Sequence, residues 1–247
     1  MSANLLELSK NVLSPGLITK IAEFTGEDPD CIKTSIDLTL PAIVGSLTGK
    51  ISNEKGASEI MKLIRDGGYD GNILKNPENS FSDNSKFNAV IDNASGSMEF
   101  LFKNKIKDMT NLISKNNGIS QKSASSLTGI LSAVVMSLTG KQLLTDNLNS
   151  RTLATFLAEQ KIFLTGLVNP DIAGILKLGS LNNIYAPSDQ FNEYSDNENR
   201  SGTGKFKPWL FMAICAALLF ILWRSCGVDK PPAIKKSENV KTDSLSN

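Results

Sequence analysis

The residues of this chain that could do chemistry are two serine–lysine pairs. Ser46 precedes Lys50 and Ser137 precedes Lys141, each by the four-residue spacing that places both side chains on one face of a helix. A lysine can serve as the base for a serine nucleophile, and the chain has no histidine to take that role. Both pairs lie at expected helix ends with no evident oxyanion site. The sequence therefore favours a structural role over an enzyme.

Carboxylate and thiol side chains do not suggest a second site. Asp28 and Asp30 flank an expected helix start, where the helix dipole favours acids, and Asp70 with Glu99 is a further pair. The formal net charge of +1 lacks the basic excess that nucleic acid binding requires. Three cysteines form neither a CxxC motif nor an even set, namely Cys31, Cys215 and Cys226. We therefore expect no cofactor, no metal and no nucleic acid partner.

The serine–lysine pairs belong to an internal repeat, in which LPAIVGSLTGK at 40–50 recurs as LSAVVMSLTGK at 131–141. The identical positions are Leu40 and Leu131, Ala42 and Ala133, Val44 and Val135, Ser46 and Ser137, Leu47 and Leu138, Thr48 and Thr139, Gly49 and Gly140, and Lys50 and Lys141. We interpret them as parts of a duplicated helical unit with copies at about 26–50 and 118–141. Each copy opens with a glycine and a capping residue. Each is expected to end at a left-handed glycine, with a lysine near the helix carbonyl end.

The same glycine–lysine steps do not fit a phosphate-binding loop. That motif is G-x-x-x-x-G-K-[ST], whereas Ile51 and Gln142 follow the two lysines. The repeat is therefore expected to be structural.

Helical spacing of apolar residues recurs throughout residues 1–185, which predicts an all-α, compact multi-helix bundle. Pro41 is expected to kink or divide the helix that contains it. The segment from Tyr69 to Gly96 is expected to be mostly loop, and Met98 to Ile113 one amphipathic helix. Later helices are expected to be capped by Ser120 and Ser150 or to begin at Asn169-Pro170.

One uncharged apolar run stands out towards the C-terminus, PWLFMAICAALLFILW at 208–223. Its 16 residues are fewer than the about 20 that a transmembrane helix needs, and extension to 228 past a snorkelling arginine supplies the rest. Tryptophans at both ends suit the membrane–water interface. We therefore predict a single transmembrane helix over 208–228, with the anchor residues Pro208, Trp209, Trp223 and Arg224.

The flanking segments complete the expected organisation. Residues 186–207 are polar and poor in large aliphatic side chains, which predicts a flexible linker, and 229–247 predict a disordered tail. No signal peptide is evident, so we expect the helical domain in the bacterial cytoplasm and the tail in the periplasm. Basic residues beside the apolar run are slightly more numerous on its C-terminal side, which weakly favours the opposite orientation.

The segments GEDPDCIKTSIDLTLPAIVGSLTGK and GISQKSASSLTGILSAVVMSLTGK, followed by LATFLAEQKIFL at 153–164, carry a family resemblance. They resemble the YidB-like bacterial domain of unknown function, family 937, over roughly residues 20–180. The resemblance implies an all-α fold and assigns no activity and no catalytic residue. Some membrane-anchored relatives continue into an OmpA-like peptidoglycan-binding domain, an architecture from which this chain departs.

These features favour a membrane-tethered, non-enzymatic interaction or scaffold module at the bacterial inner membrane. Its expected partners are the lipid bilayer and a protein, with a second copy of the chain among the candidates. One alternative is a cell-envelope component that contacts periplasmic or cell-wall partners through its C-terminal side. Another is an enzyme with a Ser–Lys or carboxylate site.

Overall fold

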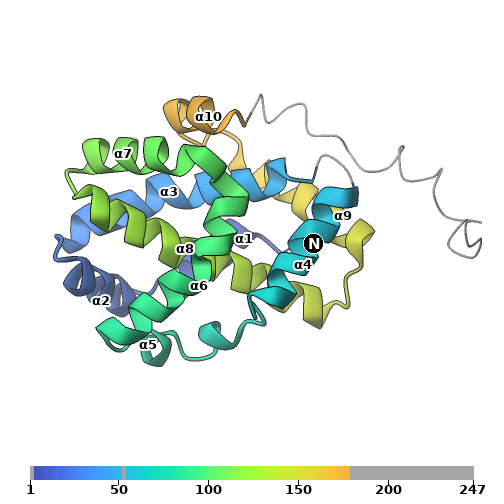
Figure 1. The fold of residues 1–247 in the computed structure, drawn as a ribbon, viewed down its shortest axis with the longest axis horizontal. Coiled ribbons are helices and arrows are strands. Elements are labelled where there is room, and N and C mark those ends of the chain that lie inside the picture. The colour runs from blue at the N-terminus through green and yellow to red at the C-terminus, as the bar shows by residue number, and fades with distance from the viewer. Residues whose placement is uncertain (1–2, 52–53, 179–247) are drawn as a thin grey trace, which may run out of the picture. The chain divides into compact units, whose positions relative to one another are not determined.

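The described residues, 3–51 and 54–178, form helices and contain no strand in this computed structural model (Figure 1). The all-α, multi-helix bundle predicted from the sequence is confirmed. The predicted linker, transmembrane helix and tail lie outside the described residues. The α-helices are α1 (Leu5–Val12), α2 (Pro15–Thr25), α3 (Pro29–Gly49), α4 (Glu54–Asp66), α5 (Pro77–Ser80), α6 (Asn84–Phe102), α7 (Ile106–Asn117), α8 (Gln121–Thr145), α9 (Ser150–Glu159) and α10 (Pro170–Leu176). Short 3-10 helices are η1 (Asn72–Leu74), η2 (Lys103–Lys105) and η3 (Gln160–Leu164).

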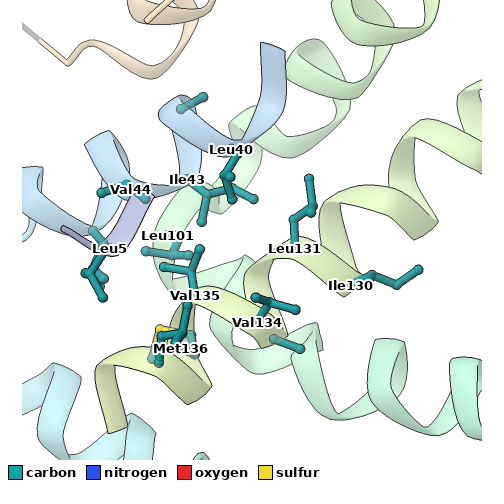
Figure 2. Packing of buried hydrophobic residues seen from close by; sticks show 14 of the residues in the cluster. Leu5, Leu40, Ile43, Val44, Leu101, Ile130, Leu131, Val134, Val135 and Met136 are labelled. Carbon is teal, nitrogen blue, oxygen red and sulfur yellow. The ribbon is translucent and has the colours of Figure 1, made fainter. Parts of the chain in front are cut away.

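Helices α3 and α8 carry the two copies of the repeat and lie at the centre of the bundle, packed against each other (Figure 1). Figure 2 shows Leu40 and Ile43 on the side of α3 that faces α8 and Leu131. These three side chains are completely buried. Because burial of each large aliphatic side chain contributes about 1.5–3 kcal/mol, this contact stabilises the folded domain.

Capping residues set where the central helices begin. Asp28 caps α3, its Oδ1 accepting the Asp30 N–H at 2.8 Å, and Pro29 occupies the first helical position. Ser120 caps α8, its Oγ accepting the Ser123 N–H at 3.0 Å. The predictions for Asp28 and Ser120 are therefore confirmed.

The prediction that Gly49 and Gly140 end their helices in the left-handed conformation is wrong. Gly49 is the last residue of α3, and Lys50 after it is right-handed. Gly140 lies inside α8, which continues to Thr145, so Lys141 is not in the last turn. The left-handed glycines are instead those that open the copies, Gly26 at φ 71° after α2 and Gly118 at φ 66° after α7.

Gly140 is needed for close packing. A Cβ atom at this position would lie 1.6 Å from the Tyr69 carbonyl oxygen. Since no real Cβ contact is that short, only glycine lets α8 approach the backbone that follows α4.

Pro41 does not divide α3, which is one α-helix from Pro29 to Gly49. A proline deprives the carbonyl four residues earlier of its helical partner. That residue is Asp37, which is exposed, so water can satisfy its carbonyl.

The prediction that residues 69–96 are mostly loop is also wrong, because α6 begins at Asn84. Its asparagine and serine residues lower the intrinsic helix propensity. Tertiary packing compensates, since α6 lies along α8 and buries Phe87, Ala94 and Ser97. Asp83 caps the helix by accepting the Lys86 N–H at 3.0 Å.

The single helix expected from Met98 to Ile113 is two helices. α6 ends at Phe102 and α7 begins at Ile106, with η2 between them. Lys103 has φ 51°, which non-glycine residues rarely adopt, and it turns the chain at this point. Apolar spacing alone did not reveal the break because both helices place apolar residues towards the same core.

The duplication in the fold extends beyond the repeated sequence. Each half has a helix, a second helix ending at a left-handed glycine, a buried helix and a fourth helix: α1 to α4 and α6 to α9. The central helix of each half packs against elements of the other half. Helix α3 packs against α7 and η3, and α8 packs against α2 and η1. Each half then closes on an Asn-Pro step that begins a short helix, Asn76-Pro77 of α5 and Asn169-Pro170 of α10.

A buried polar side chain forms hydrogen bonds with the first helix of each half or with the residues just before it. Gln160 is completely buried, its Oε1 accepts the Leu5 N–H at 2.8 Å, and its Nε2 donates to the Ala3 carbonyl at 2.9 Å. In the other half the Tyr69 hydroxyl lies 2.9 Å from the Asn93 carbonyl oxygen and 3.2 Å from Ser97 Oγ on α6. Burial raises the pKa of Tyr69, so it stays a neutral hydrogen-bonding group.

The two central helices begin at the same end of the domain, which brings two positive helix ends together. Glu27 lies between them, and its Oε1 accepts the Ser120 N–H of the α8 cap at 2.8 Å. Hydrogen bonding by the Ser123 side chain and by the Ser120 N–H holds the pKa of Glu27 below its ordinary value of 4.5. The folded domain therefore favours the charged carboxylate at this junction.

Replacing Gly140 by alanine should strongly destabilise the domain. The new methyl group has to displace the Tyr69 backbone, and we expect a loss of about 3 kcal/mol or more in urea unfolding of the full chain. Gly96→Ala in α6 is the matched control, because nothing lies within 4 Å of its Cβ position. The free energy of unfolding of this control should rise by about 0.5–1 kcal/mol. A Gly140→Ala protein as stable as the Gly96→Ala protein would contradict the close-packing role.

Glu27→Gln should lower stability at neutral pH by about 0.5–1 kcal/mol, as expected for a charge at a helix terminus. The folded pKa is depressed, so the stabilisation is present above pH 4.5 and is lost as the pH falls through the lower folded value. The free energies of unfolding of the two proteins should therefore become equal in acid. Glu23→Gln, at an exposed position of α2, is the control and should change little at any pH. If wild type and Glu27→Gln still differed in stability by the same amount in strong acid, the stabilising role of the Glu27 carboxylate would be contradicted.

Candidate functional site

The Ser46–Lys50 pair is not assembled for catalysis. Ser46 is 3 % exposed, and its Oγ has no hydrogen-bond partner. Lys50 therefore does not receive a proton from it, and the hydroxyl is closed off from a substrate. Ser137 is likewise buried in α8, with 2 % of its surface exposed, while Lys141 is exposed. The repeated serines serve as small core residues in both copies.

The apolar positions of the repeat are buried together with the serines. Ala42 of α3 is completely buried, and Ala133, its counterpart in α8, is 2 % exposed. The larger aliphatic residues of both copies are buried as well: Leu40, Val44 and Leu47 in α3, and Leu131, Val135 and Leu138 in α8. These positions therefore belong to the core, and a site open to solvent has to be sought at the ends of the two helices.

Lys50 lies over an aromatic ring from the other half. Its Nζ is 5.2 Å from the centroid of the Phe100 ring, within the range of a cation–π contact. Burial lowers the pKa of Lys50, and the nearby Lys103 lowers it further, whereas Glu59 acts in the opposite direction. We call this arrangement the Lys50–Phe100 contact.

Lys141, the corresponding residue of the second copy, borders an open space. A hollow of about 460 Å³ is formed by α1, the segment before and at the start of α5, and Leu138 and Lys141 of α8. We call it the Lys141 hollow. Its lining combines apolar, amide and charged side chains: Leu8, Asn11, Val12, Ser14, Leu74, Lys75, Asn76, Pro77, Glu78, Leu138 and Lys141.

A second hollow, of about 320 Å³, lies where α2 ends and α6 and α8 begin. Hydroxyl and amide groups dominate its lining, together with Lys122 and the ring of Phe24. That ring is stacked on Phe87 with centroids 4.5 Å apart. Ser120, one of these polar residues, is the N-cap of α8.

Two of the carboxylates considered in the sequence have local structural roles. Asp28 is engaged as the α3 cap, and Asp70 Oδ1 accepts the Asn72 N–H at 2.8 Å within a turn. Within ranges 3–51 and 54–178, no group of three or more His, Cys, Asp or Glu side chains could hold a metal ion.

One helix of the described part, α8, is long and apolar enough to cross a membrane. Of its most apolar window, 83 % is buried inside the domain. Burial of that extent is what a core helix has, and it follows from the contacts of α8 with α3, α6 and α7. The predicted anchor residues Pro208, Trp209, Trp223 and Arg224 lie outside the described residues.

Sequence reasoning missed both the Lys50–Phe100 contact and the Lys141 hollow. Each joins the end of a repeat copy to a helix far away in the chain, α6 in one case and α1 in the other. The sequence feature that points to both places is the lysine that ends each copy of the repeat, Lys50 and Lys141.

Comparison with known proteins identifies the family of this chain. A family described as bacterial protein of unknown function (DUF937) matches residues 7–142, a range that contains both copies of the repeat. No curated protein and no solved structure matches the chain.

Ser46→Ala should leave stability unchanged or raise it by up to about 1 kcal/mol, because it removes a buried hydroxyl that has no partner. Ser97→Ala is the matched variant, since Ser97 Oγ is buried and donates to the Ala94 carbonyl at 2.7 Å. It should lose about 1 kcal/mol in the same denaturant titration. A serine-directed fluorophosphonate should not label the wild-type chain, and labelling that disappears in Ser46→Ala would restore the nucleophile hypothesis.

Proposed function

We propose a function for this chain, which belongs to the DUF937 family of bacterial proteins of unknown function. It is a non-enzymatic helical interaction module that residues 208–228 hold at the bacterial inner membrane. The helical domain faces the cytoplasm, and its partner is another protein or a second copy of the chain.

The observation that carries this proposal is the use of the reactive side chains in packing and capping. The buried Ser46 hydroxyl has no partner, Asp28 caps a helix, and Lys50 lies on a phenyl ring. A nucleophile needs a base within hydrogen-bonding reach. Ser46 does not meet that requirement, because its hydroxyl has no hydrogen-bond partner.

Support for the membrane tether comes from composition. The run at 208–223 has no charged residue and carries the two tryptophans of the chain at its ends. Extension to 228 reaches the length of a membrane-spanning helix. The polar linker at 186–207 gives the helical domain a reach of roughly 25 Å if it behaves as a flexible coil.

Two arginines in the apolar run should release the protein from the membrane. Each arginine near a helix centre costs about 2.5–3.5 kcal/mol of insertion, so Leu218→Arg with Leu219→Arg should abolish it. We expect the wild-type chain to stay in the pellet after alkaline extraction of membranes and the double variant to be soluble. Replacing both leucines by isoleucine is the matched control and should remain in the pellet. A wild-type chain that extraction releases would contradict the tether.

Thiol labelling decides the orientation independently. Cys226 follows the apolar run, whereas Cys31 lies on the helical domain. In spheroplasts of cells producing a Cys215→Ala protein, an impermeant maleimide should label Cys226 at once and Cys31 only after lysis. The opposite pattern would place the domain outside and favour an envelope component.

Crosslinking in intact cells tests the interaction role. The full chain should capture a protein that an anchor-only control does not, and an unrelated anchor should preserve that capture. Loss of capture with the unrelated anchor would show that residues 208–228 themselves make the contact.

A further inference from the structure

The two halves of the domain can be compared position by position around the repeated lysines. Leu8 of α1 and Phe100 of α6 each lie 18 residues before the left-handed glycine of their half, Gly26 and Gly118. Lys141 borders the same hollow as Leu8, just as Lys50 lies over Phe100. By this count Leu8 and Phe100 occupy corresponding positions in the two halves, each beside one of the repeated lysines.

The place around Lys50 is filled by the protein itself. The Phe100 ring is half-buried, and the lysine covers it. Nearby, Leu178 Cδ1 lies 3.3 Å from a Cβ position built at Gly45, so the segment after α10 also packs on this end of α3.

The corresponding place around Lys141 is open. Leu8 is smaller than the phenylalanine of the other half, and the Lys141 side chain is exposed. The space left here is the Lys141 hollow, whose volume of about 460 Å³ falls within the range of small-molecule sites. Buried or half-buried side chains of Leu8, Leu74 and Leu138 form its apolar part.

Charge is distributed unevenly around this apolar part. Lys75 and Lys141 are exposed at its border, against the single acid Glu78. Glu78 lies in the first turn of α5, where the helix dipole favours a carboxylate. The two lysines remain to attract an anionic group, and amide groups of Asn11 and Asn76 add polar partners beside them.

We propose that the Lys141 hollow binds an anionic amphiphile, a molecule with an apolar chain or ring and a carboxylate or phosphate head. The apolar part takes the place that the Phe100 ring occupies in the other half, beneath the lysine. The head contacts Lys75 and Lys141. A free fatty acid and an anionic phospholipid share this chemistry. The proposal does not depend on the membrane tether, because the hollow belongs entirely to the helical domain.

Photocrosslinking of the full-length chain tests the proposal and locates the ligand. The protein is placed in phosphatidylcholine nanodiscs and exposed to dodecanoic acid carrying a diazirine, or to phosphatidic acid carrying the same group. Crosslinked peptides should come from α1 and from residues 74–78. Labelling by the fatty acid alone identifies a free carboxylate as the ligand, and labelling by the phospholipid alone identifies a lipid headgroup. Both outcomes support the site.

Two variants close the hollow or change its charge. Leu8→Phe copies the residue of the other half and should reduce labelling of these peptides about tenfold or more, with the melting temperature preserved. Lys141→Glu should weaken labelling by a similar factor, as expected for loss of a charge-assisted contact, whereas Lys141→Arg should retain it. Leu112→Phe and Lys115→Glu, both on α7, are the matched controls and should label like wild type.

Three results would overturn the proposal. The first is unchanged labelling in Leu8→Phe. The second is labelling confined to the apolar side chains that the described domain leaves most exposed, Leu144, Ile162 and Leu167. The third is equal labelling by a diazirine-bearing dodecanol, because a neutral head would remove the part assigned to the lysines.

Discussion

The packing of α3 against α8 is the constraint on which the rest of this domain depends. Both helices are buried around most of their circumference, and most of the other helices pack against one of them. The buried polar residues of both helices are serines and threonines, and some of their hydroxyl groups donate to the backbone of the same helix. Thr48 and Thr139 do so, donating to the Gly45 and Val135 carbonyls at 2.8 Å. The repeated residues therefore serve mainly in the packing of the core.

The duplicated unit supports this central pair of helices through contacts between the two halves. Each half supplies a capped, glycine-opened helix, and the halves exchange contacts so that each covers the central helix of the other. The shared end of the two central helices needs negative charge, which Glu27 and Asp28 supply. Gln160 and Tyr69 hold the first helix of each half by hydrogen bonds from related positions, one through a side-chain amide and the other through a hydroxyl group.

Differences between the halves give the two repeated lysines different surroundings. Where the duplicated surroundings contain a phenylalanine, the lysine lies on its ring, and where they contain a leucine, a hollow remains. Ala42 and Ala133 are buried alike in the two copies, whereas Leu8 and Phe100, which lie beside the repeated lysines, differ in size. Binding in such a protein is expected at the ends of the central helices, where apolar surface, lysines and solvent meet.

The sequence by itself determined the all-α class, the internal repeat and the caps at Asp28 and Ser120, because these follow from local spacing and backbone chemistry. It could not determine what Gly140 does, since the carbonyl that excludes a side chain there belongs to Tyr69, far away in the chain. The helix from Asn84 was missed because contact with α8 outweighs its weak local propensity. The Lys141 hollow was likewise decided by tertiary structure alone, because it exists only where α1, α5 and α8 meet.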